Sequence, residues 1–564
     1  MVKNLLQFIC ILAFWFNPCY AQTRSVERIY ISTDRDVYVA GETIWLSLYN
    51  FDMNRTTHRF SDLSCVAYVE LRSDESLMCS VKLRINQGRG SGRMELPPSL
   101  PTGNYRLIAY TKQMINEKDI SFFDKIIPIY NTLSLERIPQ NVAVREEEGS
   151  DISHSFSKVD SKVVDVKWGI DRDGVPRNFS APISLINKSD EEISLNISIV
   201  RADIPAPQEF TIQDFLNGKM ANPASIEFVQ RYIPEFEGEI ISGRMTNKEE
   251  IISKDKSIYL SAVGPSVEIY ASSVDSLTGN FSFFTNSLYG KREIAIECPS
   301  AQEAIFELFD PFVKPPVAPV PILYLDKRYE PYLTQRSIGM QMSRRFGIDT
   351  LYSKTTIFDD PFFYNNKPII YTLDNYTRFP AISDIMIEYI SEMRFRRSSN
   401  QWLLQILLET GFGRDFIDGP LIVIDGIAIF DHELLLKYDP LKVETLSIYQ
   451  SVYRIGNTIF NGIAKWNTYT GKYPGLNLGK NAMIVDFEGV QYPSRFTGRE
   501  VATNENVPDV RTLLYWDPQI ELKLGEECEI VFSTSSIRGD YVIIMEGVTQ
   551  SGQPIYYRSE FTVK

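Results

Sequence analysis

Histidine is the scarcest reactive residue in this chain of 564 amino acids, which contains three. His58, His154 and His432 lie far apart, and none has a cysteine or histidine neighbour at the spacing of a metal site. Metal centres and Ser-His-Asp triads need such side chains to converge. We therefore expect no metal ion, no cofactor and no histidine-dependent catalysis, and we expect His432 to be a solvated turn residue.

Cysteines are also few, and their spacing excludes most cysteine chemistry. After residue 21 no C-x-x-C pair occurs among those that remain, which are Cys65, Cys79, Cys298 and Cys528. If the predicted hairpin turn centres on Asp74 and Glu75, Cys79 lies opposite Glu70 rather than Cys65. A Cys65–Cys79 disulfide is therefore the less favoured alternative, and buried free thiols are the expected state.

Long apolar runs are missing after the first 21 residues. Segment 1–21 has an early cation, Lys3, an apolar stretch and Ala21 before the expected cleavage point, which is typical of a secretory signal peptide. A lipoprotein signal ending at Cys19 is the second interpretation, because Pro18 suits it poorly. No other segment reaches the roughly 20 apolar residues of a membrane helix. We expect an exported protein that is not an integral membrane protein.

Blocks of basic residues are absent as well, and the formal net charge is −14. This balance argues against nucleic acid or anionic lipid as the main partner. Neighbouring acids such as Asp359 and Asp360 do not make the converging pair of a glycosidase, because adjacent side chains on a strand point to opposite faces. The glycine-rich segment 88–92 lacks the Lys-Ser/Thr of a phosphate loop and is predicted to be a hairpin turn. We expect no enzyme.

Along most of the chain, apolar and polar residues alternate with a period of two, which indicates a mainly β protein. Residues 33–44 read TD+..Y..GE.I, and residues 96–111 read LP..LP.GNY.L.AYT. Together these patterns resemble the MG2 domain of bacterial alpha-macroglobulin-like proteins. The resemblance implies a macroglobulin or immunoglobulin-like β-sandwich over residues 22–135.

The middle of the chain divides by composition and pattern. Residues 136–235 are expected to hold an acidic linker at 141–160, a second β-sandwich segment and a helix at 210–233. Residues 236–310, with the pattern G.I.G.....V.......G.F.F, resemble the carboxypeptidase-regulatory-like β-sandwich. Residues 311–375 begin with five prolines in twelve positions and are expected to be a linker followed by an irregular region.

A third resemblance covers residues 376–475. The segments PLIVIDG at 420–426, VETLSI at 443–448 and GNTIFNGIAKWNT at 456–468 resemble the patterns PL.VIDG, VE.I.V and G....G.I...T, which recur in this order in the plug domain of TonB-dependent outer-membrane receptors. The resemblance implies a small α/β domain, with helices expected at 382–390 and 401–409 and with no barrel after it. The residues it marks for interaction or structure are Asp425, Gly426, Val443, Glu444, Gly456, Gly462 and Thr468.

The C-terminal residues 476–564 return to the strand pattern and resemble a macroglobulin segment. We expect them to complete a sandwich with residues 160–201. The reactive thioester of alpha-macroglobulins needs the motif GCGEQ, whereas Cys528 stands in the sequence GEECEI. The chemistry of a covalent trap is therefore not expected.

The expected fold is mainly β: tandem macroglobulin/immunoglobulin-like sandwiches, a carboxypeptidase-regulatory-like sandwich and a small α/β plug-like domain. The favoured function is a non-enzymatic envelope scaffold or docking component of an outer-membrane transport or TonB-linked assembly. Its partner would be an outer-membrane or periplasmic protein of a Gram-negative envelope. The alternatives are a carbohydrate- or peptide-binding component of a nutrient-uptake system, and a protease trap without a thioester.

Overall fold

The computed structural model describes residues 26–53, 59–74, 76–118, 122–134, 142–145, 159, 161–202, 204, 210–218, 229, 231–246, 256–286, 288–313, 319–346, 352–354, 367–399, 401–410, 413–492, 494–496 and 509–564. The mainly β character predicted from the sequence is confirmed, with the strands in several separate sheets. The expected signal peptide, His58, His154 and the Asp359-Asp360 pair lie outside the described residues. No helix in the described part is both long and apolar enough to cross a membrane.

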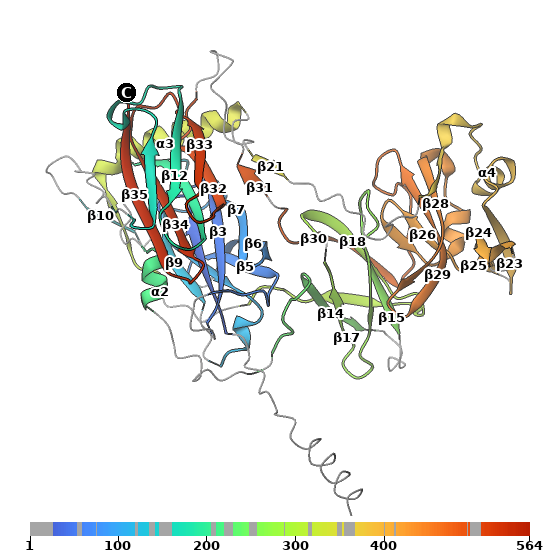
Figure 1. Ribbon diagram of the computed structural model, residues 1–564. Coiled ribbons are helices and arrows are strands. Elements are labelled where there is room, and N and C mark those ends of the chain that lie inside the picture. Colours follow the sequence, from blue (N-terminus) through green and yellow to red (C-terminus); the bar gives the residue numbers. More distant parts are fainter. Residues whose placement is uncertain are drawn as a thin grey trace, which may run out of the picture.

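The N-terminal sandwich is formed by the first nine strands (Figure 1). They are β1 (Glu27–Thr33), β2 (Tyr38–Val39), β3 (Thr43–Asp52), β4 (Arg59–Phe60), β5 (Val66–Arg72), β6 (Leu77–Asn86), β7 (Arg89–Glu95), β8 (Gly103–Tyr110) and β9 (Phe123–Tyr130). They follow the order β1-β3-β7-β6-β5-β8-β9-β2, with β4 beside β3. Strand β6 pairs with β5 over most of its length and with β7 at its end, so the sheet folds back over one core. A hairpin turn joins β6 and β7 at Gln87 and Gly88, so the turn expected at 88–92 is correct at its first residue, whereas residues 89–92 belong to β7.

A second sandwich combines two segments from distant parts of the chain. Its strands are β11 (Val164–Trp168), β12 (Ser180–Asn187), β13 (Ile193–Arg201), β32 (Leu513–Leu522), β33 (Glu527–Ser533), β34 (Gly539–Thr549) and β35 (Pro554–Val563). The sheets are β11-β12-β33 and β32-β13-β34-β35, around a common apolar core. The expected pairing of residues 160–201 with the C-terminal strands is confirmed.

The two sandwiches are packed closely against each other. All seven residues of β1 are buried, although a sandwich strand with one solvent face should alternate. The hydroxyls of Tyr30 and Tyr49 explain this, because they donate to the side chain and the backbone carbonyl of Glu546 at 2.8 and 2.9 Å. The second sandwich thus covers the outer face of the first.

A third β unit separates this body from the α/β domain (Figure 1). It contains β14 (Ile240–Thr246), β15 (Ser257–Ala262), β16 (Ile269–Ser273), β17 (Asn280–Phe284), β18 (Lys291–Glu297), β19 (Ile305–Leu308) and β30 (Ala482–Glu488), in the sheets β17-β14-β19 and β16-β15-β18-β30. Strand β30 falls in the range 476–564 that the sequence analysis gave to the C-terminal sandwich. It joins this unit instead, because its seven residues pair with β18 in a continuous ladder.

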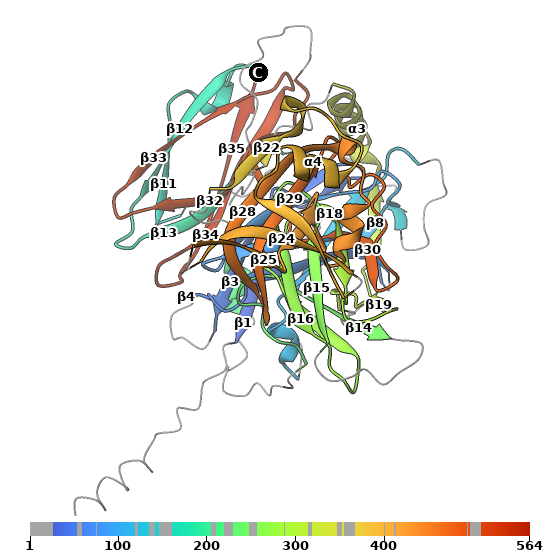
Figure 2. The same cartoon turned by 90° about the vertical axis from the view of Figure 1, so that its right-hand side faces the viewer.

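The α/β domain lies at the far end of the molecule and faces the viewer in Figure 2. Its elements are β22 (Ile369–Thr372), α4 (Ile382–Glu388), β23 (Met393–Ser398), β24 (Gln401–Thr410), β25 (Gly413–Asp418), β26 (Leu421–Ile424), β27 (Ile427–Ile429), α5 (His432–Leu436), β28 (Val443–Ile455) and β29 (Thr458–Thr468). The sheets are β22-β28-β29-β26-β27 and β23-β24-β25. The expected helix at 401–409 is wrong. Leu404, Ile406 and Leu408 are buried at a period of two, and β24 pairs on both sides.

The connecting regions contain more structure than their composition indicates. In the expected linkers lie β10 (Val142–Arg145), β20 (Leu323–Asp326), α3 (Glu330–Arg345) and β21 (Tyr352–Lys354), with β10 parallel to β20 and β21 paired with β31 (Ser494–Phe496). Of the helix expected at 210–233, the described residues contain α2 (Ile212–Gly218). Short 3-10 turns occur at Met114–Asn116, Arg172–Gly174, Lys327–Tyr329, Leu373–Asn375 and Pro440–Lys442.

Candidate functional site

Asp425 joins the ends of two strands in the α/β domain. It follows β26, whose apolar residues are fully buried between β27 and β29. Its carboxylate accepts from the backbone N–H of Thr468 at 2.7 Å, from the Thr468 hydroxyl at 2.6 Å and from the N–H of Tyr473 at 2.6 Å. Asp425 is 2% exposed, so these bonds replace those of water. The structure thus brings together two of the residues that the plug resemblance marks.

The turn at Asp425 and Gly426 also contacts the neighbouring β unit. The N–H of Gly264 donates to the carbonyl of Asp425 at 3.0 Å. Gly426 has a φ of +92°, and a Cβ built there would lie 2.2 Å from the carbonyl oxygen of Ala262. Glycine is therefore required twice, by the backbone conformation and by the close approach. This turn at Asp425 and Gly426, called the signature turn below, thus packs on the end of β15.

The other marked residues are spread along the β28–β29 hairpin. Val443 is buried and lies opposite Thr468 in the ladder. Gly456, with a φ of +57°, forms the hairpin turn, and Gly462, with a φ of +98°, lies beside the bulge of β28. Glu444 is exposed. Four of the seven residues therefore gather at one end of the sheet, with Glu444 beside them on the surface.

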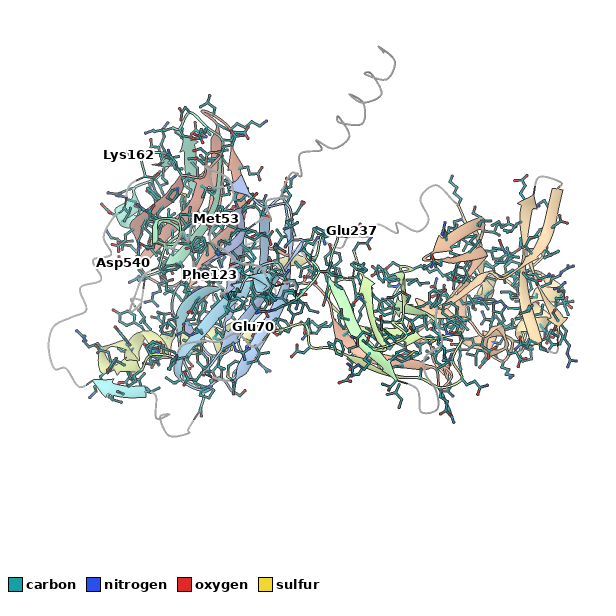
Figure 3. All side chains as sticks on the ribbon, turned by 90° about the horizontal axis from the view of Figure 1, so that it is seen from below. Met53, Glu70, Phe123, Lys162, Glu237 and Asp540 are labelled. Carbon is teal, nitrogen blue, oxygen red and sulfur yellow. The ribbon has the colours of Figure 1, made fainter. Side chains whose placement is uncertain are left out.

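The surfaces between the N-terminal sandwich and the third β unit hold a buried ionic cluster that sequence reasoning missed. The Tyr68 hydroxyl donates to Oε1 of Glu235 at 2.8 Å, and Lys82 pairs with Glu239 at 2.5 Å. Burial raises the pKa of Glu235 to about 7, raises the pKa of Glu239 and lowers the pKa of Lys112. The neighbouring Glu237 lies at this junction in Figure 3. No sequence signal identifies the cluster, since its members come from four separate segments.

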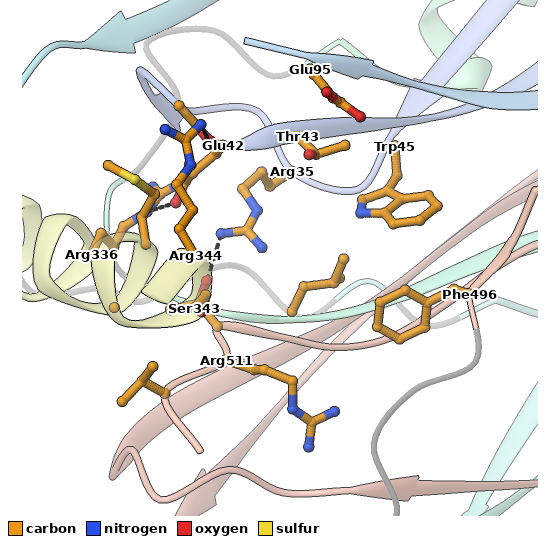
Figure 4. A pocket seen from close by; sticks show the side chains of 16 residues that line it. Arg35, Glu42, Thr43, Trp45, Glu95, Arg336, Ser343, Arg344, Phe496 and Arg511 are labelled. Atoms are coloured by element: carbon orange, nitrogen blue, oxygen red, sulfur yellow. Dashed lines mark hydrogen bonds and ion pairs between the residues drawn. The ribbon is translucent and has the colours of Figure 1, made fainter. Parts of the chain in front are cut away.

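A cavity of about 290 Å³ lies where α3 meets the N-terminal sandwich and the start of β32 (Figure 4). Helix α3 is held there by Arg336, which pairs with Glu42 at 2.5 Å and also donates to the carbonyl of Val37. The walls carry several arginines together with aromatic and aliphatic side chains. Their sequence positions are far apart, so the sequence alone does not reveal the site.

The described histidine, His432, and the four cysteines beyond residue 21 lie in separate parts of the structure. His432 is half-buried rather than solvated: it begins α5, and its Nδ1 accepts from the N–H of Leu404 at 2.9 Å. Burial lowers its pKa. The four cysteines beyond residue 21 are free thiols, as expected, but only Cys298 is buried, and the other three are half-buried. Cys79 lies opposite Leu71 rather than Glu70, because the β5–β6 register shifts between Leu71 and Arg72. The described residues contain no group of three or more His, Cys, Asp or Glu side chains placed to hold a metal ion.

The chain matches no protein-family model and no curated protein. Among solved structures it is similar to Salmonella alpha-2-macroglobulin reacted with methylamine, at 9% identity and a TM-score of 0.24 over 95% of this chain and 39% of that one. It is also similar to native E. coli alpha-2-macroglobulin, at 9% identity and a TM-score of 0.23 over 97% and 40%. Dimeric latent PorU from Porphyromonas gingivalis matches at 8% identity and a TM-score of 0.14 over 96% and 34%. The chain thus spans about two fifths of the macroglobulins, and TM-scores this low support no conclusion about what it does.

Proposed function

We propose that this protein is a non-enzymatic, exported envelope scaffold whose α/β domain docks onto an outer-membrane transport assembly. The macroglobulin-like sandwiches form the support, and the plug-like domain is the recognition unit. The observation that carries the proposal is the placement of the signature turn. Asp425 and Gly426 pack against the end of β15 in the same chain, so that the domain stands away from the paired sandwiches (Figure 1).

The contact between the α/β domain and the third β unit supports a fixed presentation of the domain. Tyr259, Val267 and Ile269 of the β unit share an apolar core with residues of the domain such as Leu421 and Tyr449. A shared core of this kind holds two units in one orientation, because separating them would expose all of these side chains to water. A scaffold needs such rigidity to place a docking surface at a defined distance from its support.

Affinity capture from detergent-solubilised envelopes tests the proposal. The bait is the full chain, compared with a chain in which residues 367–478 are replaced by a short Gly/Ser linker. That deletion exposes the shared core, so the shortened chain also carries Tyr259→Thr and Ile269→Thr. We expect a membrane protein to co-purify with the full chain and not with the shortened chain. Equal recovery with both baits would refute the docking role.

Circular dichroism and tryptophan fluorescence show whether the shortened chain keeps its folded sandwiches. Trp45, Trp168 and Trp516 remain in it and are all at least partly buried. A blue-shifted emission and a cooperative thermal transition confirm that the support is intact. Loss of the partner is then attributable to the missing domain.

The two alternative functions, a protease trap and a carbohydrate- or peptide-binding component, predict different experimental results. A protease trap predicts cleavage in an exposed stretch such as residues 141–160, of which residues 142–145 form β10 and pair with β20. Backbone held in a sheet resists proteases. Limited proteolysis that leaves the chain uncut would dismiss the trap. A glycan array would identify a carbohydrate-binding component, which needs no membrane protein for its activity.

A further inference from the structure

The cavity beside α3 is a second feature with binding chemistry, far from the α/β domain and independent of the docking proposal. Figure 4 shows its three walls: α3, the β2–β3 region of the N-terminal sandwich and the segment that leads into β32. Its volume of about 290 Å³ lies near the lower end of the range of small-molecule sites. Since liquid water occupies about 30 Å³ per molecule, the cavity has room for on the order of ten non-hydrogen atoms.

Four arginines line this cavity in a protein whose formal net charge is −14. Arg336 is compensated by Glu42 at 2.5 Å. The other carboxylate of the lining, Glu95, pairs with Arg93 at 3.0 Å and is mostly exposed. Both acids of the wall are therefore already engaged by a guanidinium group. Of the remaining arginines of the lining, Arg35 pairs with Asp34 and Arg511 with Asp509, whereas Arg344 has no carboxylate partner among the described residues.

Arg35 and Arg344 keep donors that no described residue accepts. Arg35 bonds Asp34 through Nε at 2.9 Å and Thr512 through Nη1 at 2.9 Å, which leaves Nη2 without a bond to the described residues. Its guanidinium lies at the centre of the view in Figure 4. Arg344 donates to the carbonyl of Gly41 at 2.8 Å and pairs with no carboxylate in the described part of the chain. A ligand group with more than one oxygen atom could accept hydrogen bonds from both Arg35 and Arg344.

Arg511 also lines the cavity, but in Figure 4 its guanidinium is directed away from Arg35 and Arg344. The residue is 6% exposed, and Asp509 engages its Nε and Nη2, the latter at 2.6 Å. Its Nη1 is buried and has no hydrogen-bond partner among the described residues. Its Nη2 also donates to the carbonyl of Ser533 at 3.3 Å, so this guanidinium is turned toward the second sandwich and is not among the donors of the proposed site.

The opposite part of the lining is apolar. Trp45, Phe496 and Leu513 contribute to it, and the rings of Trp45 and Phe496 meet edge to face with centroids 5.5 Å apart, whereas Met340 lies on the side of Arg344. Inorganic phosphate would leave this surface in contact with water, whereas a ligand with a hydrocarbon or aromatic body would cover it. The lining therefore favours an amphipathic ligand.

We propose that the cavity binds a small amphipathic carboxylate. Arg35 holds the acid group, with Arg344 contributing charge at the mouth, and the apolar body lies against Trp45 and Phe496. Carboxylates match the planar fork of arginine, which accounts for the use of arginine rather than lysine around the cavity. This is a binding site, and no bond is made or broken there.

Ligand-observed NMR titrations of the full mature chain test this proposal with three probes: phenylacetate, its neutral analogue phenylacetamide, and inorganic phosphate. The variant Arg344→Glu reverses the charge at the mouth. Arg345→Glu is the matched control, because it makes the same charge change on the next exposed residue, which does not line the cavity. Thermal unfolding of both variants shows that their fold is retained.

We expect saturable binding of phenylacetate to the wild-type chain and to Arg345→Glu, with at least tenfold weaker binding to Arg344→Glu. Phenylacetamide and phosphate should each bind at least tenfold more weakly than phenylacetate. Three results would overturn the proposal: no saturable binding of phenylacetate, equal losses in the two charge variants, or equal affinity for either of the other probes.

Discussion

Tyr68 and Glu235 connect two domains through a buried hydrogen bond, in which the Tyr68 hydroxyl donates to Oε1 of Glu235 at 2.8 Å. Tyr68 belongs to the central strand β5 of the N-terminal sandwich, and Glu235 precedes the first strand of the third β unit. The backbone carbonyl of Glu235 also accepts from the N–H of Cys65 at 2.7 Å. The contact between the N-terminal sandwich and the third β unit therefore includes an ionisable group, the carboxyl of Glu235.

The stability of this contact should depend on pH. Glu235 has a pKa of about 7 in the folded chain, against 4.5 for an ordinary glutamate. The folded state therefore keeps a proton that the unfolded state loses, and its free energy of unfolding falls as the pH rises from about 4.5 to about 7. Glu235→Gln removes this titration. We expect the stability of the variant, relative to wild type, to increase between about pH 5 and pH 7.5 in urea unfolding.

The matched control for this prediction is Glu237→Gln, because Glu237 is exposed two residues away. Its stability relative to wild type should not change with pH over the same range. A Glu235→Gln variant whose relative stability is constant from about pH 4 to pH 8 would show that this carboxyl does not titrate as described. Lys82, Lys112 and Glu239 face the same cluster and stay unchanged in both variants.

Replacement of Asp425 should destabilise the α/β domain. Three donors converge on the two carboxylate oxygens, and the amide nitrogen of asparagine cannot accept from any of them. Asp425→Asn keeps a residue type that tolerates the φ of +47°, so its effect reports the hydrogen bonds. An unsatisfied buried donor costs about 1–3 kcal/mol. Chemical denaturation followed by the emission of the buried Trp466 measures the loss.

Glu444→Gln provides the comparison, because this residue of the same motif is exposed. Surface substitutions of this kind change stability by about 0.5 kcal/mol or less. Similar losses in the two variants would mean that the Asp425 contacts contribute little. Gly426→Ala should instead disturb the packing on Ala262, where its Cβ would lie 2.2 Å from the carbonyl oxygen.

Separation of Arg336 from Glu42 should loosen α3. The Arg336 side chain is 1% exposed, and its Nη2 lies 2.5 Å from Oε2 of Glu42. Removal of one partner from a buried pair costs about 3–5 kcal/mol, since the other charge loses its compensation. We expect Arg336→Met to be more destabilising than the double variant Arg336→Met/Glu42→Gln in thermal unfolding. A double variant as unstable as the sum of both single variants would exclude a direct interaction.

The strand pattern made most of the β architecture predictable. Period-two alternation predicted many strands of both sandwiches, and the resemblance to a macroglobulin segment led to the expectation that residues 160–201 pair with the C-terminal strands. Helix α3 could not be predicted in this way, because its buried positions are Arg336, Ser337, Gly339 and Met340. Its attachment depends on an ion pair with Glu42, which leaves no hydrophobic periodicity in the sequence.

The sequence marked residues that the structure places close together, but it did not predict their contacts. The motif resemblance marked Asp425, Gly426 and Thr468, and the structure joins all three at one end of the sheet. That the turn would pack on Ala262 and Gly264 depends on how two domains dock, and local patterns do not encode this. The arginine-lined cavity needs three separate segments to meet, so residue spacing alone could not reveal it.

Site-specific photo-crosslinking in intact envelopes tests the docking role most directly. A photoreactive amino acid at Ile387, which is 80% exposed on the α/β domain, reports the proposed surface, and one at Leu524, which is 64% exposed on the C-terminal sandwich, reports the support. The account predicts a crosslink to a membrane protein from position 387 and none from position 524. A membrane-protein crosslink from position 524 together with none from position 387 would contradict it.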